Sequence, residues 1–203
     1  MIDAIERASG RPVSRETIER FEQYVDLLRT ASAEHNLIAA STIVAIWDRH
    51  IVDSAQLVRL ETRVGASWVD IGSGAGLPGV VIALLTEGPI TLVEPRRLRA
   101  EFLADAVHRL GLGHRVTVLG LAISNLCGQF DMITARALAP LPKLLEMARH
   151  VSRPDTIWVL PKGRTAKSEL AEAQRSWHCN VRIEASCTDP AASILVLSRV
   201  GRK

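Results

Sequence analysis

Three glycines at alternate positions follow an acidic residue in the stretch WVDIGSGAGLPG, which runs from residue 68 to residue 79. Apolar residues precede the glycines and the apolar run VVIALL follows them, so the pattern predicts a strand, a tight turn and a helix. Glycine adopts backbone angles that other residues avoid, and it lets a ligand lie against the main chain near the free N–H groups of the helix. The turn at Gly72, Gly74 and Gly76 therefore predicts a site for a nucleotide-like ligand.

Two carboxylates narrow the class of ligand. Glu94 ends the next predicted strand, 24 residues after Asp70, where an acid in doubly wound folds accepts hydrogen bonds from ribose hydroxyls. NAD and S-adenosylmethionine both carry such a ribose, but NAD sites usually have a third glycine where this chain has Leu77. Asp70 suits a carboxylate that orients the turn and the methionine end of S-adenosylmethionine. We therefore expect the glycines and both carboxylates to bind S-adenosylmethionine; a Glu94 that only caps its strand is the structural alternative.

A cation, an imidazole and a carboxylate stand close together before the glycine turn. Arg49, His50 and Asp53 fall within one turn of a predicted helix, and Asn36 precedes that helix. Residues at this spacing are neighbours on a helix surface. They predict either a polar cluster that contacts a substrate or a salt bridge between the helix and the body of the protein with a hydrogen-bonded histidine.

Further cations follow the predicted strands, namely Arg96, Arg97, Arg136, Lys162 and Arg164. In an open parallel sheet, the loops after the strands share the edge that binds ligands. A positive rim at that edge suits the phosphates of RNA, whereas solvated surface side chains are the alternative. The formal net charge of +3 is too small to identify a partner by itself.

The elements that must position these residues alternate along the chain. Helical patterns cover residues 14–33 and 41–57 and predict an N-terminal helical extension, residues 1–62, packed on the core domain, residues 63–203. Strand patterns follow at 68–71, 90–93, 115–119, 130–135, 156–160, 181–184 and 194–199, with helical patterns at 80–85, 96–110, 140–150 and 166–177. This alternation predicts an α/β fold with a doubly wound, mostly parallel seven-stranded sheet, and the short link before the last strand predicts an antiparallel pair at one edge.

The composition predicts a globular protein, because 47% of the 203 residues are hydrophobic and 23% are charged. No apolar run approaches the roughly 20 residues that cross a bilayer, and the first ten residues lack a positive leader before an apolar block. We expect a cytoplasmic protein that does not contact membranes. Cys127, Cys179 and Cys187 form no CxxC pair, so we expect buried free thiols and no metal site.

Five segments together are similar to one known family. They are HNLIA at 35–39, RHIVDS at 49–54, VDIGSGAGLPG at 69–79, FDMITARALAPL at 130–141 and LPKG at 160–163. Over about residues 20 to 200 the chain resembles the bacterial 16S ribosomal RNA guanine-N7 methyltransferase family, also called glucose-inhibited division protein B. The resemblance implies a Rossmann-like class I fold and methyl transfer from S-adenosylmethionine to guanine 527 in the 530 loop of 16S ribosomal RNA. The substrate would be the 30S subunit or an assembly intermediate, and we expect the enzyme to be a monomer.

The resemblance also implies contacts to the methyl donor. By position, Gly72 and Leu77 touch the donor, Ala122 and Ile123 lie beside its adenine, and Arg136 lines the site. The family usually has Arg and Glu where this chain has Leu121 and Ile123. Adenine contacts in this chain would therefore have to come from backbone N–H groups.

On the acceptor side, we expect Arg136 and Lys162 to be the catalytic residues and to hold the target guanine or its phosphate. The expected RNA contacts are Asn36, Arg49, His50, Arg96, Arg97, Arg136, Lys162 and Arg164. Guanine N7 carries a free lone pair, so its methylation needs alignment at about 3 Å and exclusion of water, not a general base. The chain agrees with this chemistry, because it lacks an Asn/Asp-Pro-Pro-aromatic motif and a cysteine after the fourth strand. Two other functions stay open: a binding module for S-adenosylmethionine without turnover, and a methyltransferase for a small molecule.

Overall fold

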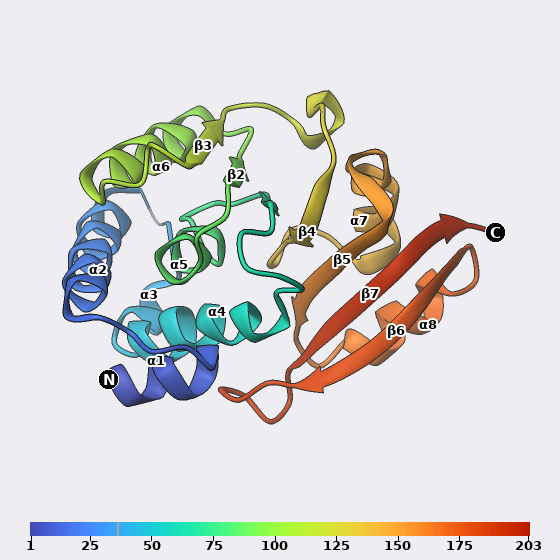
Figure 1. The fold of residues 1–203 in the computed structure, drawn as a ribbon, viewed down its shortest axis with the longest axis horizontal. Helices are drawn as coiled ribbons and strands as arrows, with labels where there is room; N and C mark the ends of the chain where they lie inside the picture. Colours follow the sequence, from blue (N-terminus) through green and yellow to red (C-terminus); the bar gives the residue numbers. More distant parts are fainter. Residues whose placement is uncertain (36) are drawn as a thin grey trace.

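Seven strands form one sheet in the computed structural model, which describes residues 1–35 and 37–203 (Figure 1). The strands are β1 (Trp68–Ile71), β2 (Ile90–Val93), β3 (Val116–Leu119), β4 (Phe130–Thr134), β5 (Ser152–Lys162), β6 (Trp177–Ala185) and β7 (Ser193–Arg202). Their order is β3-β2-β1-β4-β5-β7-β6. Strands β1 to β5 are parallel to one another, and β7 is antiparallel to both β5 and β6. The predicted doubly wound, mostly parallel sheet with an antiparallel edge is confirmed.

Strand β1 occupies the point at which the strand order reverses. It pairs with β2 on one side and β4 on the other, and all four of its residues are buried. A strand covered on both faces needs a continuous apolar run, which explains Trp68, Val69 and Ile71. At such a reversal the loops diverge to opposite faces and leave a crevice at the carboxyl ends of the strands. The glycine turn begins at this crevice.

Helices cover both faces of the sheet (Figure 1). They are α1 (Ile2–Ser9), α2 (Arg15–His35), α3 (Ala40–Ile43), α4 (Asp53–Ala55), α5 (Gly79–Leu85), α6 (Arg97–Arg109), α7 (Leu141–Ala148) and α8 (Ala166–Ala173). Helix α2 packs against α5 and α6, whereas α7 and α8 pack on each other beside the C-terminal strands. Hydrophobic side chains from α2, including the fully buried Phe21, Tyr24 and Leu28, join one core cluster with α5 and β2. The domain boundary near residue 62 stays a prediction, and the hydrophobic core is continuous across it.

The second predicted helix of the extension is not continuous, which corrects the expectation for residues 41–57. After α3, the chain forms a π-helical turn at Trp47–Val52, then α4 and a 3-10 helix at Gln56–Leu60. Ile46 and Ile51 are both fully buried although they stand five residues apart. An α-helix would turn residues at that spacing to different sides, and the wider π turn brings them to one side. The same turn contains Arg49 and His50.

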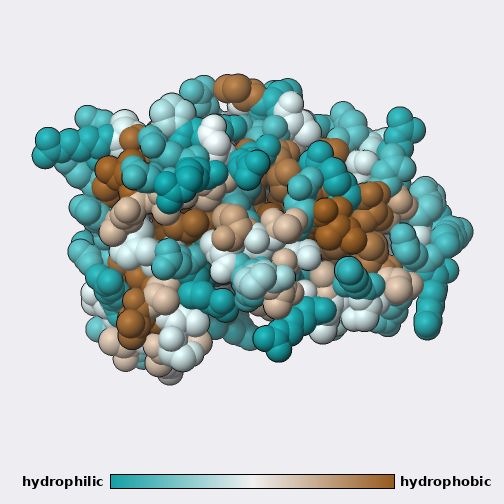
Figure 2. All heavy atoms as spheres, turned by 90° about the horizontal axis from the view of Figure 1, so that it is seen from below, coloured by the Kyte–Doolittle hydropathy of each residue, from teal (hydrophilic) through white to brown (hydrophobic). Residues whose placement is uncertain are grey.

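Two other expectations are wrong. Trp177 begins β6 and does not end the preceding helix, because α8 stops at Ala173; the Trp177 ring is buried, with the Arg202 guanidinium 4.6 Å above its centre. The cysteines are free as expected, but Cys127 and Cys187 are exposed and Cys179 is half-buried. Across the described residues, every helix is too short or too polar to cross a bilayer. Figure 2 shows one face of the molecule, on which hydrophobic residues form separate patches among hydrophilic ones.

Candidate functional site

The glycine turn after β1 is fixed to the end of β2. Gly72, Gly74 and Gly76 have φ angles of 71°, 59° and 90°, as the prediction of a glycine-dependent turn requires. The N–H groups of Gly72 and Ser73 donate to the carbonyl of Val93 at 2.8 and 3.0 Å. Ser73 Oγ also accepts from the Val93 N–H at 3.1 Å. These bonds hold the turn at the carboxyl end of β2.

Asp70 stabilises the turn from within β1. Its Oδ2 atom accepts a hydrogen bond from the Gly79 N–H at 3.0 Å, so it joins the strand to the start of α5. Its Oδ1 atom is buried without a hydrogen-bond partner among the described residues. Burial raises the pKa of Asp70 from 3.8 to about 7, against the lowering effect of hydrogen bonds from Gly79 and Ser73. The unpaired oxygen leaves one acceptor or donor position for a polar ligand group.

Glu94 connects the turn to the next helix. Its two oxygens accept hydrogen bonds of 2.9 Å from the N–H groups of Gly74 and Arg96. The residue is only 4% exposed. A carboxylate has about four acceptor positions, so two remain for ribose hydroxyls. Glu94 therefore stabilises the loop, as the structural alternative supposed, and keeps the capacity to bind a ribose.

Tyr24, from α2 of the extension, contacts the same turn from the other side. Its hydroxyl donates to the Ala75 carbonyl at 2.7 Å, and it would lie 2.8 Å from a Cβ atom at Gly76. Complete burial raises the pKa of Tyr24 well above its ordinary value, so the hydroxyl stays protonated and donates. The helical pattern at residues 14–33 did not reveal this contact.

The other residues predicted to bind the methyl donor can contact it mainly through their backbone. Leu77 and Ile123 are buried in the core, whereas Ala122 is exposed immediately before the short helix at Ile123–Asn125. A Cβ atom at Gly74 would meet other atoms only at 3.7 Å, so the turn is open there. The open backbone, the unpaired Asp70 oxygen and the Glu94 carboxylate together fit the polar groups of S-adenosylmethionine.

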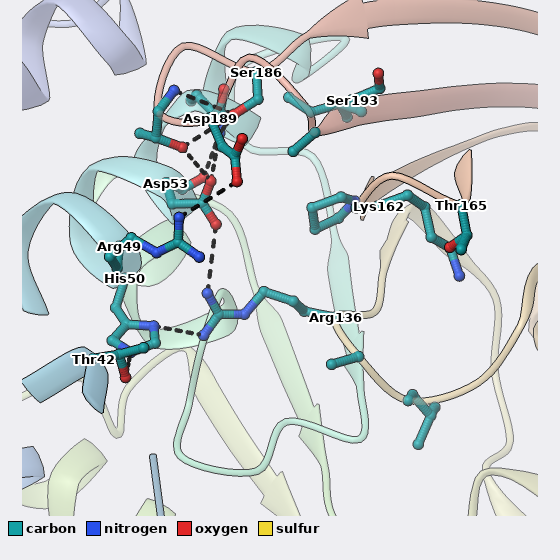
Figure 3. A pocket seen from close by; sticks show the side chains of 18 of the residues that line it. Thr42, Arg49, His50, Asp53, Arg136, Lys162, Thr165, Ser186, Asp189 and Ser193 are labelled. Atoms are coloured by element: carbon teal, nitrogen blue, oxygen red, sulfur yellow. Dashed lines mark hydrogen bonds and ion pairs between the residues drawn. The ribbon is translucent and has the colours of Figure 1, made fainter. Parts of the chain in front are cut away.

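A cavity of about 760 Å³ lies next to the loop that follows β4 (Figure 3). Its walls come from the segment of Leu37 to Gln56, from the loop after β4, from the loop after β5, and from the turn between β6 and β7. The cavity volume suits a nucleotide-sized group. Within the described residues, no three His, Cys, Asp or Glu side chains are grouped in a way that could hold a metal ion.

Arg136 extends from the loop after β4 toward the extension (Figure 3). Its guanidinium lies 3.5 Å from Asp53 Oδ2 and 3.3 Å from His50 Nδ1. The Arg136 and Asp53 side chains are each 21% exposed, so their ion pair is partly shielded from water. The sequence placed Arg136 and His50 in the site, and the structure brings them together.

His50 is neutral in this arrangement. Because a guanidinium can only donate, Nδ1 of His50 accepts from Arg136, and Nε2 donates to Thr42 Oγ1 at 2.9 Å. Thr42 in turn donates to the Ala39 carbonyl at 2.7 Å. Burial and the charges of Arg136 and Arg49 lower the pKa of His50 to about 4. His50 thus orients Arg136 as an uncharged acceptor.

Asp53 also forms a hydrogen bond with the turn between β6 and β7. Its Oδ1 accepts from Thr188 Oγ1 at 2.6 Å and from Gln56 Nε2 at 2.9 Å. The Gln56 side chain accepts from the Cys187 N–H at 2.9 Å. The polar residues of this turn and Gln56 were not predicted as part of the site, because only the fold brings these distant segments together.

Lys162 lies on the other side of the cavity from Asp53 and His50 (Figure 3). Its Nζ donates to the Ala139 carbonyl at 2.9 Å and to Glu169 Oε2 at 2.8 Å. Glu169 also accepts from the Leu141 N–H at 2.8 Å. Lys162 is therefore already bound to the loop after β4, and one of its three N–H groups remains for a ligand.

The other predicted RNA contacts are at the surface. Arg49 is half exposed and lies 3.4 Å from Asp189 at the mouth of the cavity. Arg97 pairs with Glu101 at 2.7 Å on α6, and Arg96 and Arg164 are exposed. Ion pairs this exposed are weak enough to be replaced by phosphates. Asn36 lies outside the described residues.

The sheet order and the turn between β1 and α5 define a class I S-adenosylmethionine-dependent methyltransferase. The fold is similar to that of an S-adenosylmethionine-dependent methyltransferase from Aquifex aeolicus, with a TM-score of 0.59 at 15% identity over 76% of this chain and 92% of that one. It is also similar to an O-methyltransferase from Bacillus cereus solved with SAH, with a TM-score of 0.56 at 17% identity over 87% and 90% of the two chains.

Sequence comparison gives the family. Residues 17–192 match the model of the family described as rRNA small subunit methyltransferase G. The chain is 46% identical over 200 residues to a ribosomal RNA small subunit methyltransferase G of Zymomonas mobilis, covering 94% of this chain and 90% of the relative. It is 48% identical over 191 residues to the corresponding protein of Rhizorhabdus wittichii, covering 93% and 88%. The chain belongs to the rRNA small subunit methyltransferase G family.

Proposed function

We propose that this protein transfers the methyl group of S-adenosylmethionine to N7 of a guanine in 16S ribosomal RNA. The observation that supports the proposal is that the turn for the methyl donor and the cavity for the acceptor are in contact through one loop. The loop of residues 136–140 lines the cavity, and its Leu138 side chain lies against Gly72 of the glycine turn, residues 72–76, which is called the donor turn below. Lys162 binds the same loop through the Ala139 carbonyl. The relatives in the same family are ribosomal RNA methyltransferases by name.

The donor supplies an electrophilic methyl group on sulfur. In the transfer, the N7 lone pair forms the new bond to carbon, the carbon–sulfur bond breaks with its electron pair on sulfur, and no proton is lost. The protein therefore has to align the two groups and exclude water. His50 and the Arg136–Asp53 pair fit this task. The one acceptor nitrogen of the His50 ring already accepts from Arg136, so the ring offers no free general base, and Asp53 offsets the charge of the guanidinium.

The charge of the product explains why this pairing matters. A guanine methylated at N7 gains a positive charge, which an unpaired arginine nearby would repel. Asp53 offsets the charge of Arg136 at 3.5 Å, so the cavity can accept a cationic purine. We propose that Arg136 and the free N–H of Lys162 hold the guanine or its phosphate, and that Arg49, Arg96, Arg97 and Arg164 contact RNA phosphates.

We also propose that the target is guanine 527 of the 530 loop within the 30S subunit or an assembly intermediate, and that the enzyme acts in the cytoplasm as a monomer. The test is incubation with labelled S-adenosylmethionine and 30S particles that lack the methyl mark, beside free 16S RNA and fully assembled, marked particles. Label at N7 of one guanine, decreasing steeply with salt, is the expected result. Donor binding without transfer would reduce the protein to a binding module, and transfer without RNA would indicate a small-molecule substrate.

A further inference from the structure

Leu138 lies where the donor turn meets the cavity. Its side chain lines the cavity, and a Cβ atom built on Gly72 would lie 2.7 Å from its Cδ1 atom. The leucine thus packs directly on the first glycine of the donor turn. It is nevertheless 38% exposed, so an apolar group that covered it would be bound favourably.

The backbone around Leu138 is held on both sides. Before it, the Arg136 side chain is bound by Asp53 and His50. After it, the Ala139 carbonyl accepts from Lys162. Ala137 has a φ of 53°, a left-handed conformation that is unfavourable for a residue with a Cβ atom. Such strain persists where surrounding contacts enforce it, and it is concentrated at functional positions.

From this geometry we propose that Leu138 is the platform on which the acceptor guanine packs. Its methyl groups would contact the face of the purine and hold N7 in line with the bond between the methyl carbon and the sulfur of the donor. The inference rests on the proposed function, because it names the residue that positions that function's substrate. Leu138 is suited to this role since it contacts the donor turn and the cavity at once.

The side-chain type has a further consequence. A flat aromatic platform would attract the cationic methylated purine more strongly than the neutral substrate, through a cation–π interaction. A leucine makes similar dispersion contacts with both forms. We therefore infer that Leu138 aligns the guanine without retaining the product.

The test compares three variants with the wild-type protein, after methylation of 30S particles by the wild type has been established. Leu138→Ala should lower kcat/KM for the particles by about tenfold or more through lost alignment, with donor affinity by calorimetry nearly unchanged. Leu138→Met, which keeps the apolar volume, should retain most activity. Ile183→Ala removes a similarly exposed side chain on β6 outside the cavity and should retain activity.

Each alternative outcome has a distinct meaning. If Leu138→Ala weakens donor binding and leaves the acceptor constants unchanged, the leucine only supports the donor turn and the proposal is wrong. Unchanged kinetics in Leu138→Ala would also overturn it. A wild-type protein that binds donor but methylates no RNA would instead contradict the proposed function.

Leu138→Phe tests product retention separately. Its first turnover should proceed, whereas steady-state turnover should slow because the methylated product leaves slowly. A rapid-quench time course would show a burst equal to the enzyme concentration. A linear time course at the wild-type rate would contradict the inferred effect on release.

Discussion

The Tyr24 hydroxyl donates a 2.7 Å hydrogen bond to the Ala75 carbonyl and so joins the N-terminal extension to the donor turn. Tyr24→Phe should keep the packing of the ring but leave that buried carbonyl unpaired, at about 1–3 kcal/mol. We expect weaker donor binding in calorimetry, since the turn loses its support.

Phe21→Leu is the matched control for Tyr24→Phe, because Phe21 is also fully buried on α2 but contacts the core only through apolar atoms. It should lower the melting temperature without changing donor affinity. Equal donor affinity in Tyr24→Phe and the wild type would show that the turn holds its shape without this bond.

Gly74 tests whether the donor lies against the backbone of the turn. Gly74→Val and Gly111→Val both place a β-branched residue at a positive φ, 59° and 67° respectively, so both should lose about 1–2 kcal/mol of stability. Neither position is crowded by protein atoms. Only Gly74→Val should abolish donor binding, and similar donor affinity in the two variants would show that the ligand binds elsewhere.

The pair of Arg136 and Asp53 should govern turnover more than stability. Arg136→Lys keeps the charge but cannot reach Asp53 and His50 in the same geometry, so kcat for 30S particles should fall by about tenfold or more. Asp53→Asn should have a similar effect, and the double variant should be little worse than either single one. If the loss of activity is only in proportion to the fall in melting temperature, both residues have a structural role. Arg153→Lys, which alters a pair with Asp131, is the control.

Asp70 should make stability depend on pH. Its pKa is about 7 in the folded protein and 3.8 ordinarily, so the folded state holds a proton that the unfolded chain releases between these values. The contribution of Asp70 should therefore lower the free energy of unfolding as the pH rises from about 4 to 7. This loss of stability should be complete above pH 7. Charges nearby act in both directions, since Arg136 lowers the pKa and Glu94 raises it.

Asp70→Asn removes this titration while keeping an oxygen that can accept from Gly79. Urea unfolding at pH 5 and pH 8 should show the variant gaining stability relative to the wild type as the pH rises. Asp131→Asn is the control. Despite the opposing effect of burial, hydrogen bonds from Ser67 and the charges of Arg63 and Arg153 hold the pKa of Asp131 below its ordinary value, so this carboxyl is ionised in the folded and unfolded states at both pH values, and the effect of its substitution on stability should not change between them. A stability difference that is the same at both pH values would show that Asp70 titrates normally.

Local patterns were enough to predict the sheet and the donor turn. The apolar run of β1, the glycines at 72, 74 and 76, and the alternation of strands with helices each arise within a few residues, so the strand bounds at 68–71 and 90–93 were predicted as the structure has them. The continuous helix at 41–57 was wrong because the five-residue spacing of Ile46 and Ile51 requires a π turn.

The contacts of the site were much harder to predict. Tyr24 has the pattern of a core residue, and only the packing of α2 brings its hydroxyl to Ala75. Lys162 was expected to face the substrate, but its main contacts are Ala139 and Glu169. The place of Thr188 in the site was not predicted, because its partner Asp53 is 135 residues away in the sequence.

The large separation of Asp53 and Thr188 along the chain determines the order in which the parts of the site form during synthesis. Asp53, Gln56 and Arg49 meet residues 186–189 across 130 to 140 positions. A ribosome synthesises the N-terminal part first, so the donor turn and its supports, Tyr24 and Glu94, emerge well before the turn between β6 and β7. The acceptor cavity therefore closes last, and a growing chain cannot present a finished cavity to RNA until its C-terminal hairpin has emerged.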